Sequence, residues 1–507
     1  MRDVKGEYIL AIDQGTTGTT ALVMGVDGRF HGRATREFPQ HFPEPGWVEH
    51  EPDEIWESVV GAIGEATAAA GLAGSDVSAI GITNQRESAL LWDRGTGRPV
   101  RRAIVWQDRR TADLCARLKD QGHEARVREV TGLVIDPYFS GTKVTWMLDE
   151  DPDRRAAADR GELAFGTVDS FLVWQLAGGA QRGAPHVTDV TNASRTLLMN
   201  LRTLQWDPTM ARLLDVPRVL LPKIVPSSGP IARTQGLGFL PDGIPITGMA
   251  GDQHAALFGQ ACFSRGEAKC TYGTGAFVLV NTGAKPVQSR YGLLATLAWQ
   301  IGDEAVYALE GSCFIAGAAV QWLRDGLGLI GSAPEIESLA RQVDTTQGVV
   351  FVPALAGLGA PYWDPAARGL IVGITRGTGA AHLARATLEA IAFQVDDLLS
   401  AMARDLDCPP RRLRVDGGAA ANDLLMQMQS DVSGVTVERP SELESTARGA
   451  AMLAGLGAGL FRDPAHAAQM IRIDRTFVAG LGDQERESKA SAWRDAVRRA
   501  RSPTAGT

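Results

Sequence analysis

The stretch that decides the fold is Tyr8-Ile9-Leu10-Ala11-Ile12-Asp13-Gln14-Gly15-Thr16-Thr17-Gly18, near the start of the chain. Its apolar part predicts a short strand, and Gly-Thr-Thr-Gly is typical of a turn. Further strands are predicted over residues 20–24 and 30–38. Glycine lets backbone N–H groups approach an anion, and threonine adds a hydroxyl donor. The turn is therefore a candidate phosphate loop, with an ordinary tight hairpin as the alternative.

A similar arrangement returns past the midpoint of the chain. Residues 268–280 predict a strand, a turn and a strand, with Gly273-Thr274-Gly275 at the tip. A third glycine turn, Asp416-Gly417-Gly418, follows another apolar strand. One such turn alone favours a plain hairpin, but three together favour a nucleotide site. The chain has no G-x-x-x-x-G-K-[ST] phosphate loop, and no G-x-G-x-x-G opens a helix.

The elements between these turns indicate a mixed α/β protein with two halves. A helix is predicted from Pro52 to about Gly71, a strand over residues 77–83 and another over residues 246–252. Helices are predicted over residues 253–259 and from about Asn422. Strands that run together and then alternate with helices are typical of α/β sheets. We expect domains of residues 1–258 and 259–507, related by a weak internal repeat.

Composition excludes several classes of function. The 507 residues carry a formal charge of −8, whereas nucleic-acid-binding proteins usually carry a basic field. No apolar run approaches the length needed to cross a bilayer. The five cysteines form no C-x-x-C pair, and the eight histidines show no zinc spacing. Because the first residues do not resemble a signal peptide, we expect a cytoplasmic protein without nucleic-acid or membrane partners.

Polar residues follow two predicted strands. Asn84-Gln85-Arg86-Glu87 ends one strand, where α/β sheets usually bind ligands. Arg86 and Glu87 have the donors and acceptors to bind vicinal hydroxyls, or they form a surface ion pair. Asp252 ends the other strand and is either a general base for a hydroxyl nucleophile or the N-cap of the following helix.

Aromatic residues lie near predicted loop tips. Trp106 and Phe139 are expected in the core by default, whereas Tyr138, after a proline, has a hydroxyl to offer a ligand. His254, beside Asp252, is a tempting base, but a single helical histidine is more often packed or solvated.

Taken together, the motifs resemble the FGGY family of carbohydrate kinases, from about residue 7 to residue 460. The stretches that carry the resemblance are 12–17, 45–50, 81–87, 103–107, 136–143, 189–196, 250–253, 271–275, 357–365 and 415–418. The resemblance implies two ribonuclease-H-like domains, as in actin and hexokinase, around a central cleft. It also implies transfer of phosphate from ATP to glycerol with Mg²⁺, giving sn-glycerol 3-phosphate. Alternatives are another polyol substrate, or a protein-binding ATPase of the same fold.

The resemblance further assigns roles to individual residues. Asp252 matches the catalytic base, and Asp13 matches an acid that organises the metal. The polyol-binding residues are matched by Arg86, Glu87, Trp106, Tyr138, Asp252, Gln253 and Phe277. The ATP contacts are matched by Thr16, Thr17, Gly18, Thr274, Gly317, Gln321, Gly418 and Asn422.

The chain also departs from the family pattern. Thr20 stands where many members have a basic residue, so one phosphate contact is expected to be missing. Residues 233–243 lack the sequence of the family's regulatory loops, so we expect neither sugar-phosphate nor phosphohistidine regulation. A homo-oligomer, dimer or tetramer, is expected. Residues 461–507 are predicted to form a surface helix or a subunit contact.

Overall fold

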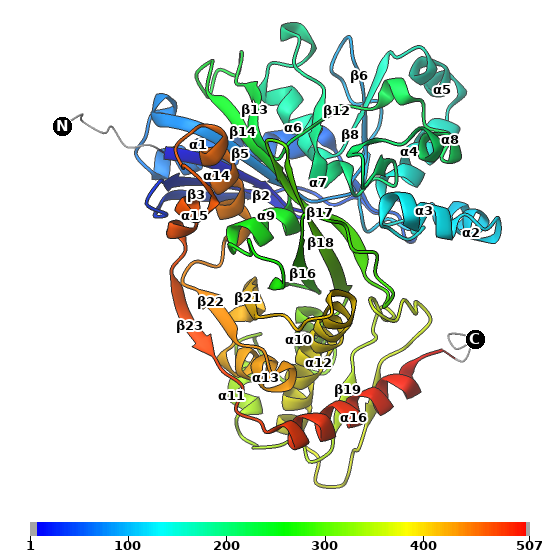
Figure 1. Cartoon of the computed structure of the whole chain (residues 1–507), viewed down its shortest axis with the longest axis vertical. Coiled ribbons are helices and arrows are strands. Elements are labelled where there is room, and N and C mark those ends of the chain that lie inside the picture. The colour runs from blue at the N-terminus through cyan, green and yellow to red at the C-terminus, as the bar shows by residue number, and fades with distance from the viewer. Residues whose placement is uncertain (1–7, 503–507) are drawn as a thin grey trace.

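A single mixed sheet runs through the part of the chain that the computed structural model describes, residues 8–502 (Figure 1). Its strand order is β23-β22-β21-β15-β16-β18-β17-β13-β14-β5-β1-β2-β3. The strands are β1 (Tyr8–Gln14), β2 (Gly18–Gly25), β3 (Phe30–Glu37), β5 (Val77–Asn84), β13 (Ser228–Arg233), β14 (Pro245–Gly251), β15 (Glu267–Tyr272), β16 (Ala276–Gly283), β17 (Leu294–Ile301), β18 (Glu304–Cys313), β21 (Arg412–Asp416), β22 (Val437–Pro440) and β23 (Ile473–Phe477).

The sheet contains the same topology twice. In the first half, β3-β2-β1 is an antiparallel meander, β5 and β14 continue it in parallel, and β13 is antiparallel. In the second half, β18-β16-β15 is again an antiparallel meander. Strands β21 and β22 continue it in parallel, and β23 is antiparallel. The two halves meet where Ser228 of β13 pairs with Ile301 of β17. The predicted repeat is thus a repeat of strand order, and the α/β prediction is confirmed.

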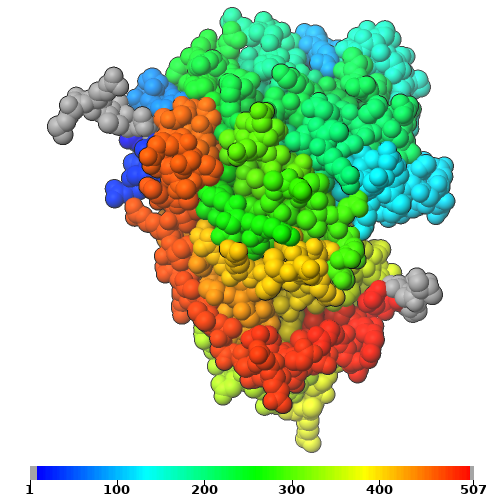
Figure 2. Space-filling view, in the orientation of Figure 1, coloured from blue at the N-terminus to red at the C-terminus, as the bar shows by residue number. Residues whose placement is uncertain are grey.

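One helix of the second half packs on the first half. Helix α14 (Ser445–Gly457) lies against β1, β5 and β14 and against α9 (Asp252–Gly259). Close packing needs small residues: a Cβ at Gly449 would lie 1.8 Å from the carbonyl oxygen of Ala255. Figures 1 and 2 show this orange segment beside the blue strands of the N-terminal half. The division at residue 258 stays a prediction. The structure adds that α14, from the second half of the chain, packs on strands of the first half.

An insertion between β5 and β13 forms the upper right of Figure 1. Helix α1 (Pro52–Ala69) precedes it and covers β2 and β3. The short strand β4 (Glu49–His50) precedes α1 and pairs with β7 of the insertion. The elements of the insertion are β6 (Leu90–Asp93), β7 (Ala103–Ile104), α2 (Ala112–Asp120), α3 (Glu124–Thr131), α4 (Ser140–Asp149), α5 (Pro152–Asp159), β8 (Leu163–Gly166), α6 (Val168–Leu176), β9 (Val187–Asp189), α7 (Val190–Ala193), β10 (Met199–Asn200), β11 (Gln205–Trp206), α8 (Pro208–Leu213) and β12 (Lys223–Val225).

The helices of the second half surround the lower part of the sheet (Figure 1). The remaining elements are α10 (Gly317–Asp325), α11 (Glu335–Ala340), β19 (Val350–Val352), β20 (Leu370–Val372), α12 (Ala380–Leu406), α13 (Asp423–Ser433), α15 (Pro464–Ala467) and α16 (Asp483–Ala500). The buried Trp493 of α16 stacks on Phe393 of α12 and donates its indole N–H to Asp397. The predicted C-terminal helix therefore packs on its own chain through one face.

All five cysteines are free, and four of them are buried. Among residues 8–502, no helix has the length and apolar character needed to cross a membrane.

Candidate functional site

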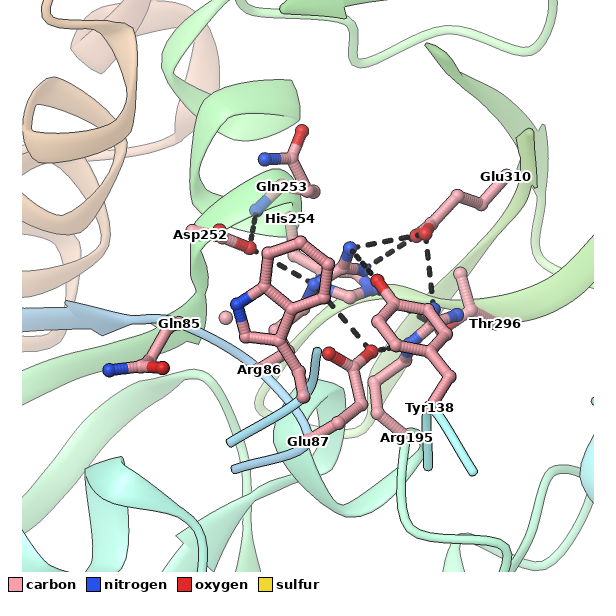
Figure 3. Close-up of polar contacts among 12 residues, drawn as sticks. Gln85, Arg86, Glu87, Tyr138, Arg195, Asp252, Gln253, His254, Thr296 and Glu310 are labelled. Carbon is pink, nitrogen blue, oxygen red and sulfur yellow. Dashed lines mark hydrogen bonds and ion pairs between the residues drawn. The ribbon is translucent and has the colours of Figure 1, made fainter. Parts of the chain in front are cut away.

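The side chains of Arg86 and Asp252 meet where β5 and β14 end. These strands are parallel neighbours, so the residues that follow them emerge at the same edge of the sheet. Arg86 Nε lies 3.0 Å from Asp252 Oδ1. The other side of the guanidinium contacts Glu310 of β18, at 2.5 Å and 3.1 Å (Figure 3). The surrounding carboxylates raise the pKa of Arg86 although burial opposes this, and Arg86 stays a cation.

Asp252 is the first residue of α9 and does not cap it. The N-cap position is Gly251, and no side chain caps this end. Asp252 Oδ1 instead accepts the backbone N–H of Gln253 at 2.6 Å. The side chain of Asp252 is 32 % exposed, whereas that of Arg86 is 2 % exposed. A carboxylate that a ligand can reach, held by a buried arginine, suits a general base better than a helix cap.

Glu87 has a backbone conformation that is unusual for a non-glycine residue, with φ at 60°. Its carbonyl oxygen accepts hydrogen bonds from Ser140 Oγ at 3.0 Å and from Lys143 Nζ at 3.4 Å. Lys143 also donates to the carbonyl of Tyr138 at 2.6 Å. Burial lowers the pKa of Lys143 to about 8. One buried lysine therefore fixes the backbone of two predicted polyol-binding residues.

The carboxyl group of Glu87 faces two arginines. Arg195 Nε lies 2.6 Å from Glu87 Oε1, and Arg86 Nε lies 3.9 Å from the same oxygen. Burial raises the pKa of Glu87, and the two guanidinium groups oppose that shift.

The predicted aromatic residues connect this cluster to the first glycine hairpin. The hydroxyl group of Tyr138 lies 3.4 Å from Arg86 Nη2, and its ring meets Trp106 edge to face at 5.7 Å. Trp106 is half-buried rather than in the core, and its indole N–H donates to Thr16 Oγ1 at 2.9 Å. Phe139 is fully buried, as predicted.

Gln253 and Phe277 occupy different positions relative to the cluster. Gln253 accepts a hydrogen bond from Lys269 of β15, which also donates to Thr271 at 2.9 Å. Phe277 is half-buried on β16. In the register of β16 and β18, Leu279 pairs with Glu310. Residues two apart share a face of a sheet, so Phe277 lies on the same face as Glu310.

An acidic residue, Asp13, lies near the end of β1, just before the tip of the first hairpin. Burial, together with the carboxylates of Asp252 and Glu444, raises the pKa of Asp13 well above its usual value. Asp13 is close in sequence to Thr16 and Thr17 at the tip, and Thr17 is exposed. In the described residues, no group of three or more His, Cys, Asp or Glu side chains is arranged to hold a metal ion.

The predicted nucleotide contacts of the second half gather around the tip between β15 and β16. The backbone N–H of Gly317, which begins α10, donates to Gly273 at 2.9 Å, and Gln321 lies one helical turn later. Gly417 has a φ of 83°, and a Cβ there would lie 2.5 Å from the carbonyl of Tyr272. This contact places the turn that holds Gly418 beside the same tip.

Two other predicted residues show different local roles. Asn422 caps α13, because its Oδ1 accepts the N–H of Leu425 at 2.9 Å. The hydroxyl group of Thr274 lies at the exposed tip, while its carbonyl accepts N–H groups of Ala316 and Ala318.

His254 is packed in the interior, which is one of the two outcomes expected for a single helical histidine. It is fully buried, and its Nε2 lies 3.2 Å from Thr296 Oγ1. Burial and the nearby charge of Arg86 lower its pKa well below the ordinary value. The side chain is therefore neutral.

Four buried charged residues at the cluster are absent from the predicted site residues: Lys143, Arg195, Lys269 and Glu310. Glu310 follows the apolar run Tyr307-Ala308-Leu309 within a strand, and Lys269 lies between Ala268 and Cys270. A charged residue inside an apolar strand needs a buried partner, because an unpaired buried charge is costly. For Glu310 and Lys269, this pattern was the signal that the sequence offered.

A sheet in which this strand order occurs twice is the architecture that actin and hexokinase share, and here a buried arginine lies beside a partly exposed carboxylate at the edge of that sheet. The model of the FGGY family of carbohydrate kinases matches this chain twice, its N-terminal domain over residues 8–259 and its C-terminal domain over residues 268–458. The chain therefore belongs to the FGGY family of carbohydrate kinases.

Within that family, glycerol kinases match nearly the whole chain. The chain is 57 % identical to the glycerol kinase of Myxococcus xanthus, covering 98 % of this chain and 100 % of that protein. It is 54 % identical to that of Deinococcus radiodurans, covering 98 % of each. The crystal structure of Plasmodium falciparum glycerol kinase with ADP superposes with a TM-score of 0.91, at 36 % identity and 98 % coverage of both chains.

Proposed function

We propose that this protein transfers the terminal phosphoryl group of ATP to glycerol, giving sn-glycerol 3-phosphate and ADP. The observation that carries this proposal is the cluster of Arg86, Glu87, Tyr138 and Asp252 at the ends of β5 and β14. The similarity to glycerol kinases over the whole chain supports it.

Glycerol has three hydroxyl groups on three carbons, so a selective site needs several polar partners and an apolar wall. Arg86 is a donor, Glu87 an acceptor, and Tyr138 either. Trp106 and Phe277, which lies on β16, supply the apolar surface. A site that hydrogen-bonds hydroxyl groups rejects analogues that lack them.

Asp252 is the proposed catalytic base. Its carboxylate accepts the proton of the terminal hydroxyl and orients the oxygen toward the γ-phosphorus of ATP. Arg86 holds that carboxylate in place from the protein side, at 3.0 Å. The accessible carboxylate oxygen is left for substrate.

The nucleotide is proposed to lie between the two hairpins. The first offers Thr16, Thr17 and Gly18, and the second offers Thr274. Further contacts are proposed for Gly317, Gln321, Gly418 and Asn422. Exposed glycine and threonine at hairpin tips give phosphate oxygens N–H and hydroxyl donors.

Mg²⁺ fits the residues around Asp13. Mg²⁺ prefers one or two carboxylates and retains water, so a single acid with no completed ligand cage suits it. Burial and the nearby carboxylates of Asp252 and Glu444 raise the pKa of Asp13 and so disfavour its ionised form, and a bound cation would offset that effect. When bound to ATP, Mg²⁺ neutralises charge on the transferring phosphoryl group.

A coupled assay for ADP release with a panel of polyols tests this function. Release should require a polyol and be fastest with glycerol. Release with a pentulose but not with glycerol would indicate another kinase of the family. ATP turnover without any polyol would indicate a protein-binding ATPase instead. Cytoplasmic location and a dimeric or tetrameric state stay predictions, checked by fractionation and by light scattering.

A further inference from the structure

Four charged side chains form a closed ring at the polyol cluster (Figure 3). In this charge ring, Arg86 and Arg195 both contact Glu310, at 2.5 Å and 3.1 Å. Arg195 also contacts Glu87 at 2.6 Å, and Arg86 closes the ring 3.9 Å from Glu87. No member exposes more than 2 % of its side chain.

We propose that Glu310 and Arg195 are positioning residues that set the affinity of the site for its polyol. They fix the orientations of Arg86 and Glu87, the two residues assigned to glycerol, so this inference rests on the proposed function. Neither Glu310 nor Arg195 is proposed to touch the substrate.

The geometry of the ring follows from the shapes of its members. A guanidinium group presents several donors in one plane, so Arg195 can contact two carboxylates at once. Glu310 uses both carboxylate oxygens, Oε2 toward Arg86 and Oε1 toward both arginines. Arg86 is thereby held on one side by Glu310 and on the other by Asp252. Its remaining freedom to rotate is small.

The ring is also balanced in charge. It holds two guanidinium groups and two carboxylates in a nearly water-free place. Removing one partner of a buried pair leaves an uncompensated charge, which drives its neighbours to new partners or to water. With a neutral residue in place of Glu310, Arg195 would keep only Glu87, and Arg86 would keep Asp252 and its longer contact with Glu87. The orientation of the carboxylate that accepts from glycerol would then change.

The ring joins the two halves of the sheet. Arg86 and Glu87 follow β5 of the first half, whereas Glu310 lies on β18 of the second. Between the two halves, the sheet itself contributes the single pairing of Ser228 with Ile301. The polyol site therefore depends on the placement of β18 relative to the first half.

The test is Glu310→Gln, which keeps the size of the side chain and removes its charge. The KM for glycerol should rise about tenfold or more, while the KM for ATP stays within about twofold. Glu267→Gln is the control, because Glu267 pairs with Arg412 and with none of the four residues of the charge ring. The control should leave both KM values unchanged.

A double variant separates positioning from general damage. Arg195→Gln leaves an excess carboxylate, Glu310→Gln leaves an excess cation, and the two together restore the balance. The rise in glycerol KM for the double variant should therefore be smaller than the product of the two single rises. Arg195→Lys keeps the positive charge but loses the planar set of guanidinium donors. Its KM for glycerol should rise less than that of Arg195→Gln.

Two results would overturn the inference. One is a glycerol KM within about twofold of wild type in Glu310→Gln. The other is an equal rise in both KM values with multiplicative effects in the double variant. If Glu310→Gln does not fold, Glu310→Asp takes its place, with a smaller rise expected for glycerol alone. Failure of the proposed function is distinct, because the wild-type enzyme itself would then not phosphorylate glycerol.

Discussion

The carboxylate of Asp252 lies 3.0 Å from Nε of Arg86, at the edge where two parallel strands end. The arginine is buried and the carboxylate is partly exposed. This pair combines a fixed cation with a carboxylate that substrate can reach. Substitutions at the site should therefore change turnover and the affinity for glycerol.

Replacing Asp252 by Asn should lower kcat by about 10²–10⁴-fold, because an amide cannot accept the proton of the attacking hydroxyl. ATP binding, measured by calorimetry, should be retained. Asp151→Asn is the control, since Asp151 caps α5 and Asn caps equally well. Turnover within about tenfold of wild type would remove Asp252 as the base.

Replacing Tyr138 by Phe removes one hydroxyl group and keeps the ring that packs on Trp106. A lost hydrogen bond contributes about 0.5–1.5 kcal/mol, so kcat/KM for glycerol should fall by about two- to twelvefold. Steady-state kinetics with varied glycerol measure this. Tyr291→Phe, at an exposed position, should behave as wild type. Equal kinetics for both variants would show that the hydroxyl of Tyr138 does not bind substrate.

Replacing Lys143 by Met leaves the carbonyl of Tyr138 without its buried donor and leaves the carbonyl of Glu87 with Ser140 alone. Each unsatisfied buried group costs about 1–3 kcal/mol, so the free energy of unfolding should fall, and the KM for glycerol should rise with it. Chemical denaturation and kinetics measure the two effects. Lys119→Met, on the exposed face of α2, is the control. Unchanged stability in Lys143→Met would contradict this role.

Replacing Asp13 by Asn should raise the Mg²⁺ concentration needed for half-maximal activity by about tenfold or more, because a neutral amide is a poorer ligand for a hard cation. Activity titrated with Mg²⁺ at saturating ATP and glycerol measures this. Asp27→Asn, in the exposed turn after β2, should not shift the titration. A titration unchanged by Asp13→Asn would place the metal elsewhere.

Acid should destabilise the protein partly through His186. Burial lowers the pKa of His186 to about 4, and its Nε2 lies 2.7 Å from the carbonyl of Phe165. The unfolded chain takes up a proton near pH 6.5, while the folded protein does not until about pH 4. Over that window the unfolded state binds more protons, so stability falls as pH falls.

His186→Gln keeps a donor for that carbonyl and cannot titrate. Between pH 6 and 4.5, it should lower the slope of unfolding free energy against pH by up to about 1.4 kcal/mol per unit. Urea unfolding at several pH values measures the slope. An identical slope in wild type and variant would show that His186 is not the group that titrates.

Local sequence was enough to predict both hairpins and the strands β1, β2, β3, β5, β14, β15, β16 and β21, but not the other strands of the main sheet. The apolar run before Asp13 forms β1, and the Gly-Thr-Gly stretch joins β15 to β16. The sequence placed Arg86 and Asp252 each after a predicted strand, and the structure shows that these two strands are parallel neighbours. The roles of these residues remain proposals.

What the sequence by itself determined is therefore the periodic and turn-forming pattern, whose physical causes lie within a few residues of the chain. What only the tertiary structure decided is which buried charges meet. Arg86 and Glu310 are 224 residues apart, and Arg195 joins them from the insertion. Their pairing follows from long-range packing, since each buried charge must find a partner and only the assembled sheet brings β18 to the end of β5.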